Sequence, residues 1–430
     1  MAREQWSSGP GFVLASIGSA VGIGNIWRFP YMVGVNGGGA FLIPYLIALF
    51  LFALPLLILE FALGRHFRTS VVPAFGTRGR PFRLAGFVLV FILTMILSYY
   101  LVVTGWTLAY FAAFARGEPL SFTEFTGSYS PLLFFALSAG IAYGVVRSGV
   151  SRGIERLSWW LMPLLFALLA LLVASALALP GAARGLAFYL TPDFSRLSDP
   201  LVWLAAFGQA FFSLGVGTGI MLTYGSYLGG GRLVRNALVI AAADLLVALL
   251  AGFMVFPIVF SFGLDPAAGV QLAFVTLPAV FAEMRFGGVL GAAFFLLLFA
   301  AALTSAVSML EVPVATLIDA WGMARGRAAG VAGGAVVLLG LPSALSYTAL
   351  RVELFGARLL DLKDFAFGTV GMVVAGVILS VSAGWFFDTR AVLEHLRLGP
   401  AWRRAFLALV RYFIPLALSA NLVARLAGRG

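Results

Sequence analysis

A glycine-rich stretch inside a long apolar segment is the feature that most restricts how this chain folds. Residues 18–30 read GSAVGIGNIWRFP, and they lie in a segment long enough to span a bilayer as a helix. Each Gly costs about 1 kcal/mol of helix stability relative to Ala, and an Arg at membrane depth costs roughly 3 kcal/mol. We therefore predict a broken helix. Free backbone at this depth is tolerated where it lines a cavity, which in secondary transporters is where substrate and ions bind.

Composition places the chain among polytopic membrane proteins. Of its 430 residues, 62% are hydrophobic and 10% are charged. Cysteine is absent, which excludes disulfides, thiol catalysis and Cys-based metal sites. Both histidines, His66 and His395, lie in basic segments, which does not favour a metal site. No cleaved signal peptide is expected, because the first apolar stretch runs directly into the glycine-rich break. Hydropathy predicts about eleven spans, at 10–35, 40–63, 86–113, 131–147, 156–179, 200–226, 236–262, 288–321, 329–347, 360–386 and 404–427.

The basic residues alternate between the two sides of the membrane. Counting along these spans, 17 of the 28 Lys and Arg residues fall on the same side as the N-terminus. The positive-inside rule then predicts a plasma-membrane (inner-membrane) protein with a cytoplasmic N-terminus and an external C-terminus. The net charge of +11 then reflects the basic residues that set the orientation of the chain in the membrane. A nucleic-acid partner is not expected, since no soluble basic surface or aromatic platform is visible.

A second interrupted span follows at 203–227, where glycines recur at 208, 215, 217 and 219. It is the sixth span, and the stretch around Asn25 is the first. Broken helices in spans 1 and 6 suggest two five-helix repeats of opposite orientation, with a site where the breaks meet. We expect an all-α fold with helices 1–5 in residues 1–180, helices 6–10 in residues 181–386, and one extra helix in residues 387–430.

The first break offers two kinds of group to a ligand. Carbonyl oxygens near Gly18, Ala20 and Val21, together with the Asn25 amide oxygen, suit a hard cation. Backbone N–H groups around Gly22 and Gly24 suit a carboxylate. The alternative is a simple kink or close helix packing, which leaves Asn25 and Arg28 unexplained.

Three later spans add candidates. Ala301, Thr304, Ser305 and Met309 share one helical face, so the two hydroxyls could complete an oxygen cage, or could bond their own backbone. Asp244 lies in apolar surroundings and could ligate a cation, relay a proton or pair with an Arg. Alternatively, Asp244 lies near the end of its helix, at the membrane boundary, and has no special role.

Two further polar sites need partners. Glu60 is expected to be structural, near Arg65. Tyr99 and Tyr100 lie in the middle of span 3, and a buried Tyr hydroxyl needs a partner. That partner could be a neighbouring backbone group or a substrate carboxylate.

These residues together resemble the neurotransmitter:sodium symporter family, in particular its bacterial amino-acid transporters. The resemblance covers almost the whole chain. It is carried by residues 3–6 (REQW), 18–30, 36–41 (NGGGAF), 60–65 (EFALGR), 153–156 (GIER), 203–219, 303–305 (LTS) and 364–365 (DF).

The resemblance implies sodium-coupled symport with two sodium ions. The first ion would be held by Ala20, Asn25, Ser213 and Asp244. The second would be held by Gly18, Val21, Ala301, Thr304 and Ser305. The substrate site would comprise Ser19, Ala20, Gly22, Ile23, Gly24, Ile96, Tyr100, Phe212, Ser213, Gly215, Thr218, Ser305 and Met309. An outer gate would pair Arg28 with Asp364, directly or through water, and Phe212 would be a lid. A cytoplasmic latch would pair Arg3 with Asp319, supported by Trp6, Ser226 and Tyr227.

Two departures from the family pattern matter. Animal members have Asn in place of Asp244 and require chloride, whereas here Asp244 supplies a fixed negative charge and Ala248 lies one turn further on. We therefore expect no chloride requirement. The family commonly has twelve spans and this chain shows eleven, so a dimer contact made through the last helix in some relatives is not assumed, and the oligomeric state stays open.

The expected substrate is a hydrophobic L-amino acid, because Ile96, Phe212 and Met309 give the side-chain pocket an apolar character without a fixed charge. The expected partners are this substrate and the lipid bilayer. The alternatives are a proton-coupled carrier in which Asp244 titrates, a sensor that binds without transporting, and a channel, which paired gate charges disfavour. An enzyme is not expected, because the sequence shows no nucleophile–base pair, metal motif or nucleotide loop.

Overall fold

The predicted all-α architecture is confirmed. The computed structural model describes residues 3–118, 120–266, 272–396 and 398–427. Within these ranges the chain is mainly helical, and its sheet is a two-stranded antiparallel pair, β1 (Glu353–Leu354) with β2 (Ala357–Arg358). Residues 1–2 and 428–430, at the outer ends of the first and third predicted segments, lie outside the described residues.

The first half of the chain supplies helices in the positions of the first five predicted spans. They are α1 (Gly9–Ala20), η1 (Gly24–Arg28) and α2 (Phe29–Val35); η2 (Gly39–Phe41), α3 (Leu42–Ala48), η3 (Leu49–Ala53) and α4 (Leu54–Phe67); α6 (Arg80–Arg116); α8 (Ser130–Arg147); and η4 (Val150–Glu155) with α9 (Arg156–Leu177). The short connecting helices are α5 (Val71–Gly76) and α7 (Phe122–Gly127).

The second half supplies the remaining six. They are α11 (Pro200–Leu214) and α12 (Ile220–Ser226); α13 (Leu233–Ser261); α15 (Gly287–Trp321); α16 (Arg325–Leu345); α17 (Leu359–Lys363), η7 (Asp364–Gly371), α18 (Met372–Val381) and η8 (Ser382–Phe386); and α20 (Pro400–Ala408), η9 (Leu409–Phe413) and α21 (Ile414–Leu426). The connections contain α10 (Ala182–Leu190), η5 (Phe194–Ser198), η6 (Leu272–Thr276), α14 (Leu277–Glu283) and α19 (Thr389–Glu394).

Within the part of the chain that the structure describes, ten of the eleven predicted spans have the length and hydropathy of a membrane span, and several helix ends differ from the prediction. Among the described residues, nine helical segments are long and apolar enough to cross a membrane, and the bent pair α1–α2 makes ten. The interrupted α11–α12 takes the place of the sixth predicted span. Helix α6 begins at Arg80 and not at residue 86, and α9 is continuous with η4 from Val150 and not from 156. Hydropathy stops at the first charges, whereas the hydrogen-bonded helix continues through them.

Both predicted breaks are present. Helix α1 ends at Ala20, and the segment that begins at Gly24 leaves it at an angle of 52°. Helix α11 ends at Leu214, and α12 begins at Ile220. Between α11 and α12 the backbone has positive φ at Gly215 (60°), Gly217 (83°) and Gly219 (84°), a region that only Gly adopts without strain. The glycines therefore specify where the second helix stops.

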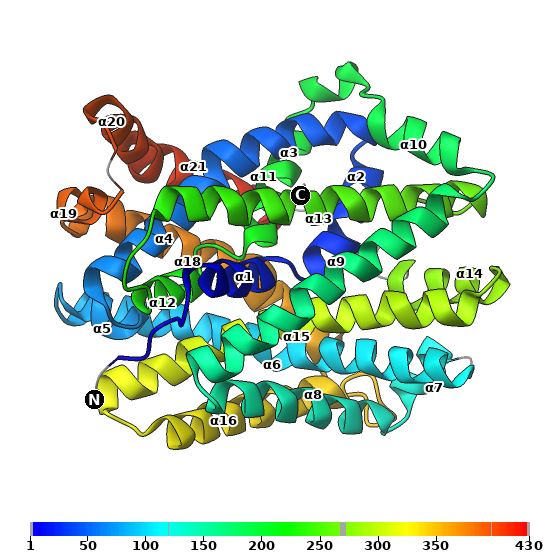
Figure 1. The fold of residues 1–430 in the computed structure, drawn as a ribbon, viewed down its shortest axis with the longest axis horizontal. Helices are drawn as coiled ribbons and strands as arrows, with labels where there is room; N and C mark the ends of the chain where they lie inside the picture. Colours follow the sequence, from blue (N-terminus) through cyan, green and yellow to red (C-terminus); the bar gives the residue numbers. More distant parts are fainter. Residues whose placement is uncertain (1–2, 119, 267–271, 397, 428–430) are drawn as a thin grey trace.

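Helix α1 lies at the centre of the bundle, where it packs against α9, α13 and α15. The short helices α5, α12 and α19 gather at the end of the bundle near the start of the chain, and α7, α10 and α14 lie at the opposite end (Figure 1). The broken segments thus meet between the two ends, surrounded by helices.

Helices α4 and α12 touch through their backbones. A Cβ atom on Gly64 would lie 2.0 Å from the Leu222 carbonyl oxygen, and one on Gly225 would lie 2.8 Å from the Phe61 carbonyl oxygen. The buried Glu60 carboxylate accepts hydrogen bonds from the backbone N–H groups of Gly217, Met221 and Leu222. Because Met221 and Leu222 lie in the first turn of α12, where N–H groups lack helical partners, Glu60 caps this helix, and through Gly217 it also holds the turn that precedes it.

Candidate ion and substrate site

The structure brings Asn25, Ser213 and Asp244 together from three helices. The Asn25 amide nitrogen donates to Asp244 Oδ1 at 2.7 Å and to Ser213 Oγ at 2.9 Å. Ser213 Oγ donates to Asp244 Oδ2 at 2.9 Å. All three side chains are buried. The cluster offers carboxylate, hydroxyl and amide oxygens beside the break, and Ala20, the fourth predicted residue, is buried at the end of α1. Such a donor set suits a small hard cation.

The Gly22 amide is engaged differently from the prediction. We expected this N–H group to meet a substrate carboxylate, and here it donates to Asn25 Oδ1 at 3.1 Å. The Asn25 side chain thus bridges the unwound backbone of α1 to Asp244 of α13. This bond orients the amide, with its oxygen towards the break and its nitrogen towards the carboxylate.

A second group of oxygens surrounds Ser305 of α15. Its Oγ lies 3.5 Å from the Gly18 carbonyl oxygen, 3.4 Å from that of Val21 and 3.1 Å from that of Ala301. Thr304 Oγ1 bonds its own helix, at 3.0 Å from the Ala300 carbonyl and 3.1 Å from that of Ala301. In this structure the Thr304 hydroxyl is therefore bonded to its own backbone, which was the alternative expectation. One of the two carbonyls that it contacts, that of Ala301, is itself a predicted sodium ligand.

The predicted substrate residues converge between the two breaks. A Cβ on Gly22 would lie 3.0 Å from Ser305 Oγ and 3.4 Å from the Tyr100 hydroxyl, and one on Gly24 would lie 2.9 Å from the Phe212 ring. A Cβ on Gly215 would meet nothing within 4 Å. Polar groups therefore lie at the Gly22 end of this region, and open space lies beside Gly215.

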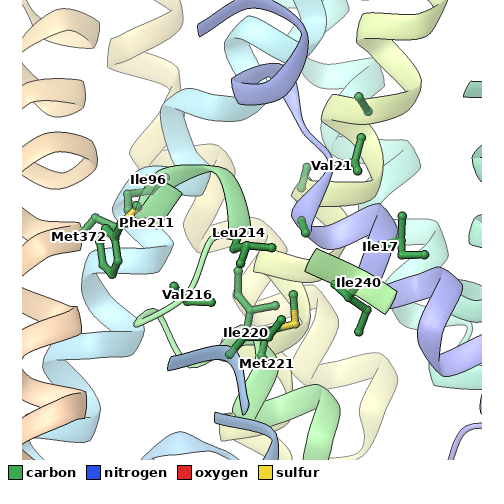
Figure 2. Packing of buried hydrophobic residues seen from close by; sticks show 14 of the residues in the cluster. Ile17, Val21, Ile96, Phe211, Leu214, Val216, Ile220, Met221, Ile240 and Met372 are labelled. Carbon is green, nitrogen blue, oxygen red and sulfur yellow. The ribbon is translucent and has the colours of Figure 1, made fainter. Parts of the chain in front are cut away.

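Buried apolar side chains pack around the second break (Figure 2). Figure 2 shows Ile96 of α6 and Met372 of α18 near Phe211, and Leu214, Val216, Ile220 and Met221 around the break between α11 and α12. Ile96 is buried, and Phe212 and Met309 are half-buried. Ser19 Oγ is buried without a hydrogen-bond partner, whereas Thr218 Oγ1 donates to the Gly215 carbonyl at 2.9 Å. Ile23 is buried beside the first break.

The two predicted gate pairs differ. Arg28 and Asp364 form no direct ion pair, since no Arg28 nitrogen lies within 4.0 Å of an Asp364 carboxylate oxygen. The Arg28 guanidinium instead stacks on Phe212, with its carbon 4.3 Å from the ring centre. Asp364 faces the Tyr99 hydroxyl. The Tyr99 hydroxyl oxygen and Asp364 Oδ1 both lie close to Gly368. Of the two forms predicted for this gate, the direct ion pair is not made in this structure, where the aromatic face of Phe212 offers the cation another partner. Pairing of Arg28 with Asp364 as a gate stays a prediction.

The second predicted pair, Arg3 with Asp319, is formed. Arg3 Nη1 lies 2.8 Å from Asp319 Oδ1 and 2.7 Å from Oδ2, and Arg3 Nη2 donates to Ser226 Oγ at 2.6 Å. The Arg3 guanidinium also lies over the Tyr227 ring, at 4.8 Å. Trp6 fixes the same segment, since its indole N–H donates to the Tyr224 carbonyl at 3.0 Å. The chain start is therefore bound to α12 and α15.

A neighbouring network was not predicted. Arg325 Nη2 lies 2.6 Å from Oε2 of the buried Glu311, and Arg325 Nη1 lies 3.1 Å from Glu4 Oε2. Tyr227 donates to Glu311 Oε1 at 2.6 Å. An ionisable residue within a span is a signal of a special role, so Glu311 could have been selected by the reasoning that selected Asp244. Glu60 carried the same signal.

Comparisons with known proteins identify the family to which this fold belongs. The model of the sodium:neurotransmitter symporter family matches residues 3–131 and 132–425. The chain belongs to this family. It is 40% identical to an uncharacterized sodium-dependent transporter of Methanocaldococcus jannaschii over 76% of this chain and 72% of the relative. A second uncharacterized sodium-dependent transporter, from Bacillus subtilis, is 40% identical over 73% of this chain and 72% of its own length.

A solved structure covers nearly the whole fold. The crystal structure of MhsT in complex with L-phenylalanine matches with a TM-score of 0.89 and 41% identity, over 98% of this chain and 100% of that one. The chain is therefore a multi-pass membrane protein of a family of sodium-dependent symporters.

Proposed function

We propose that the protein is a sodium-coupled symporter of hydrophobic L-amino acids that works by alternating access with two sodium ions. The observation that carries this proposal is the pair of oxygen clusters on either side of the broken α1. One is Asn25 with Ser213 and Asp244, and the other is Ser305 with the carbonyls of Gly18 and Val21. Free backbone and side-chain oxygens at membrane depth are the groups that bind Na⁺ in transporters with broken helices.

Coupling follows from charge. Two sodium ions and a zwitterion bring a net charge of +2 into a buried site, and the Asp244 carboxylate reduces it to +1. The substrate carboxylate would complete the first sodium site, so substrate and ion each raise the affinity for the other. Each cation that crosses the whole membrane gains about 2.3 kcal/mol per 100 mV. A fixed carboxylate at this place also removes the need for chloride, which supports chloride-independent transport.

The substrate class is inferred from the pocket. Polar groups lie at the Gly22 end, where Tyr100 and Ser305 are close. Ile96, Phe212 and Met309 leave the side-chain end apolar, and Gly215 leaves volume. A charged side chain would be buried there without a partner, which is strongly unfavourable. The related MhsT is seen in complex with L-phenylalanine, which supports large apolar side chains for this chain as well.

The gates and the topology complete the proposal. Arg3 with Asp319 would close the cytoplasmic end, and Arg28 with Asp364 would close the outer end. The N-terminus would be cytoplasmic and the C-terminus external, in the plasma (inner) membrane. Residues 1–180 and 181–386 would form the two inverted repeats, and 387–430 the extra helix.

The test is uptake of radiolabelled leucine and phenylalanine into proteoliposomes with an inward sodium gradient. Replacing sodium by choline should abolish uptake, and replacing chloride by gluconate should leave it unchanged. In a panel of unlabelled amino acids, only the apolar ones should compete. Glutamate or lysine competing better than every apolar amino acid would contradict the pocket assignment.

The same vesicles test the second candidate. Asp244 is fully buried, and a buried carboxylate is also suited to carrying a proton. Uptake driven by a pH gradient without sodium would favour a proton-coupled carrier. Sodium-dependent binding without uptake would favour a sensor.

A further inference from the structure

The last helix, α21, is bound to the first half of the interrupted span through two polar side chains. Arg425 Nε donates to Asn421 Oδ1 at 2.8 Å, and the Asn421 amide nitrogen donates to the Leu204 carbonyl of α11 at 2.7 Å. Asn421 is buried, and most of the Arg425 side chain is covered. The position of Arg425 is therefore set by α11.

Gly208 of α11 makes room for the Arg425 guanidinium. A Cβ on Gly208 would lie 2.7 Å from Arg425 Nη2 and 3.0 Å from the Asn421 amide nitrogen. Phe212 lies four residues later, so it shares a helix face with Gly208. The Arg28 guanidinium covers the Phe212 ring at 4.3 Å. Two guanidinium groups thus occupy successive turns of α11, one from α21 and one from the segment after the first break.

Both cations act on one carboxylate. The Arg425 guanidinium lies against Gly208 and the Arg28 guanidinium lies over Phe212, one turn apart on α11, so their like charges repel. The Asp364 carboxylate is near enough to both groups for its charge to act on them. The other adjacent cation, Lys363, donates to the Leu339 carbonyl of α16. Arg28 Nη1 is buried and has no hydrogen-bond partner, although Asp364 is near enough for their charges to interact. In a poorly screened site, a second cation such as Arg425 weakens the pairing of Arg28 with Asp364.

We propose that Arg425 is a positioning residue for the outer gate, which holds Arg28 away from Asp364 and so keeps the outer end able to open. Without the Arg425 charge, Arg28 is the one of these two cations that still attracts Asp364. Arg28 is then also free of the repulsion from Arg425. The direct Arg28–Asp364 pair then becomes more stable, and the outer end stays closed for longer. The inference rests on the proposed function, because it assigns a role within the gate described there.

The absence of cysteine from the sequence allows a direct test. Ile96→Cys places one thiol at a buried position of the proposed substrate site, and a membrane-impermeant maleimide applied from outside reports how often the outer end is open. In sodium without substrate, Arg425→Gln should slow labelling roughly three- to tenfold, a change typical of a partly buried charge pair. Arg425→Lys should restore labelling to near the rate of the unmodified background. Gly208→Val should slow labelling as well, because its side chain displaces the guanidinium.

A second background shows whether the effect passes through Asp364. In Asp364→Asn, Arg425→Gln should change labelling little, because coupled residues give non-additive effects and the gate carboxylate is gone. Equal or faster labelling of Arg425→Gln, or slowing that persists in Asp364→Asn, would overturn the proposal. The dissociation rate of radiolabelled phenylalanine, measured without Ile96→Cys, should fall by a similar factor. If phenylalanine does not bind but the labelling pattern holds, the proposed substrate fails and the gate inference stands.

Discussion

The substitution Thr304→Val tests whether the Thr304 hydroxyl binds sodium or only stabilises its own helix. Thr304 is 3% exposed, and its Oγ1 contacts the carbonyls of Ala300 and Ala301 at 3.0 and 3.1 Å. Valine keeps the branched shape and removes only the oxygen. A hydrogen-bonding group that faces a charge contributes about 1.5–3 kcal/mol. If Thr304 binds sodium, the sodium concentration for half-maximal binding should therefore rise roughly 10- to 150-fold.

The packing role predicts a different result. The two carbonyls belong to the same helix and keep their helical N–H partners when the hydroxyl is removed. The loss is then one neutral hydrogen bond, about 1 kcal/mol of stability, and sodium dependence is unchanged. Thr316→Val is the matched control, because Thr316 lies in the same helix, is also 3% exposed, and donates to the Val312 carbonyl at 2.9 Å.

The assay is binding of radiolabelled leucine to purified protein across a sodium titration, with thermal unfolding measured on the same samples. Thr316→Val should lower the melting temperature slightly and leave the sodium midpoint in place. Thr304→Val should move the midpoint. Identical sodium midpoints for the two variants would refute the assignment of Thr304 to a sodium site.

Four other changes test separate parts of the proposal. Asp244→Asn should weaken sodium binding or create a chloride requirement, and a wild-type protein that stops transporting in gluconate would contradict the counter-charge. Gly215→Leu should exclude aromatic substrates and spare alanine-sized ones in competition assays, at a cost of about 1–2 kcal/mol from the positive φ. Asp319→Asn should speed substrate release into the vesicle lumen roughly fivefold, since the pair that it breaks is partly exposed; unchanged release would remove the latch role. Burial, and then the charges of His66 and Arg65, lower the pKa of His395. Its contribution to stability should be present above the ordinary value of 6.5 and lost as the pH falls, so His395→Gln should flatten the melting-temperature profile between pH 7.5 and 5.5.

The places where helices break could be predicted from local sequence, because glycine acts locally. Gly22 and the series Gly215, Gly217 and Gly219 interrupt their spans where the sequence predicted. Helix ends were harder to predict, since hydropathy responds to apolar residues, whereas helix α6 already begins at Arg80 and includes the charged Arg83. The hydrogen bonds that extend the helix carry no hydropathy signal.

The site depends on contacts between distant parts of the chain. Asn25 meets Ser213 and Asp244 across 188 and 219 positions, and no periodicity specifies such a meeting. These residues were grouped through the family resemblance, and the structure brings them together. Glu60 was assigned to the neighbourhood of Arg65, yet its partners are N–H groups of α12, 157 to 162 positions away. A capping carboxylate supplied from another helix has no local signature.

The backbone contact between α4 and α12 limits how the half of the protein near Arg3 can rearrange. With Gly64 against Leu222 and Gly225 against Phe61, neither helix can slide without a steric clash. We therefore expect the half-helix after the second break to move together with α4, to which Glu60 also binds it through the Gly217, Met221 and Leu222 N–H groups. Opening at the end of Arg3 would then displace the two helices together, and the five-residue turn 215–219, which separates α12 from α11, is where we expect the backbone to bend.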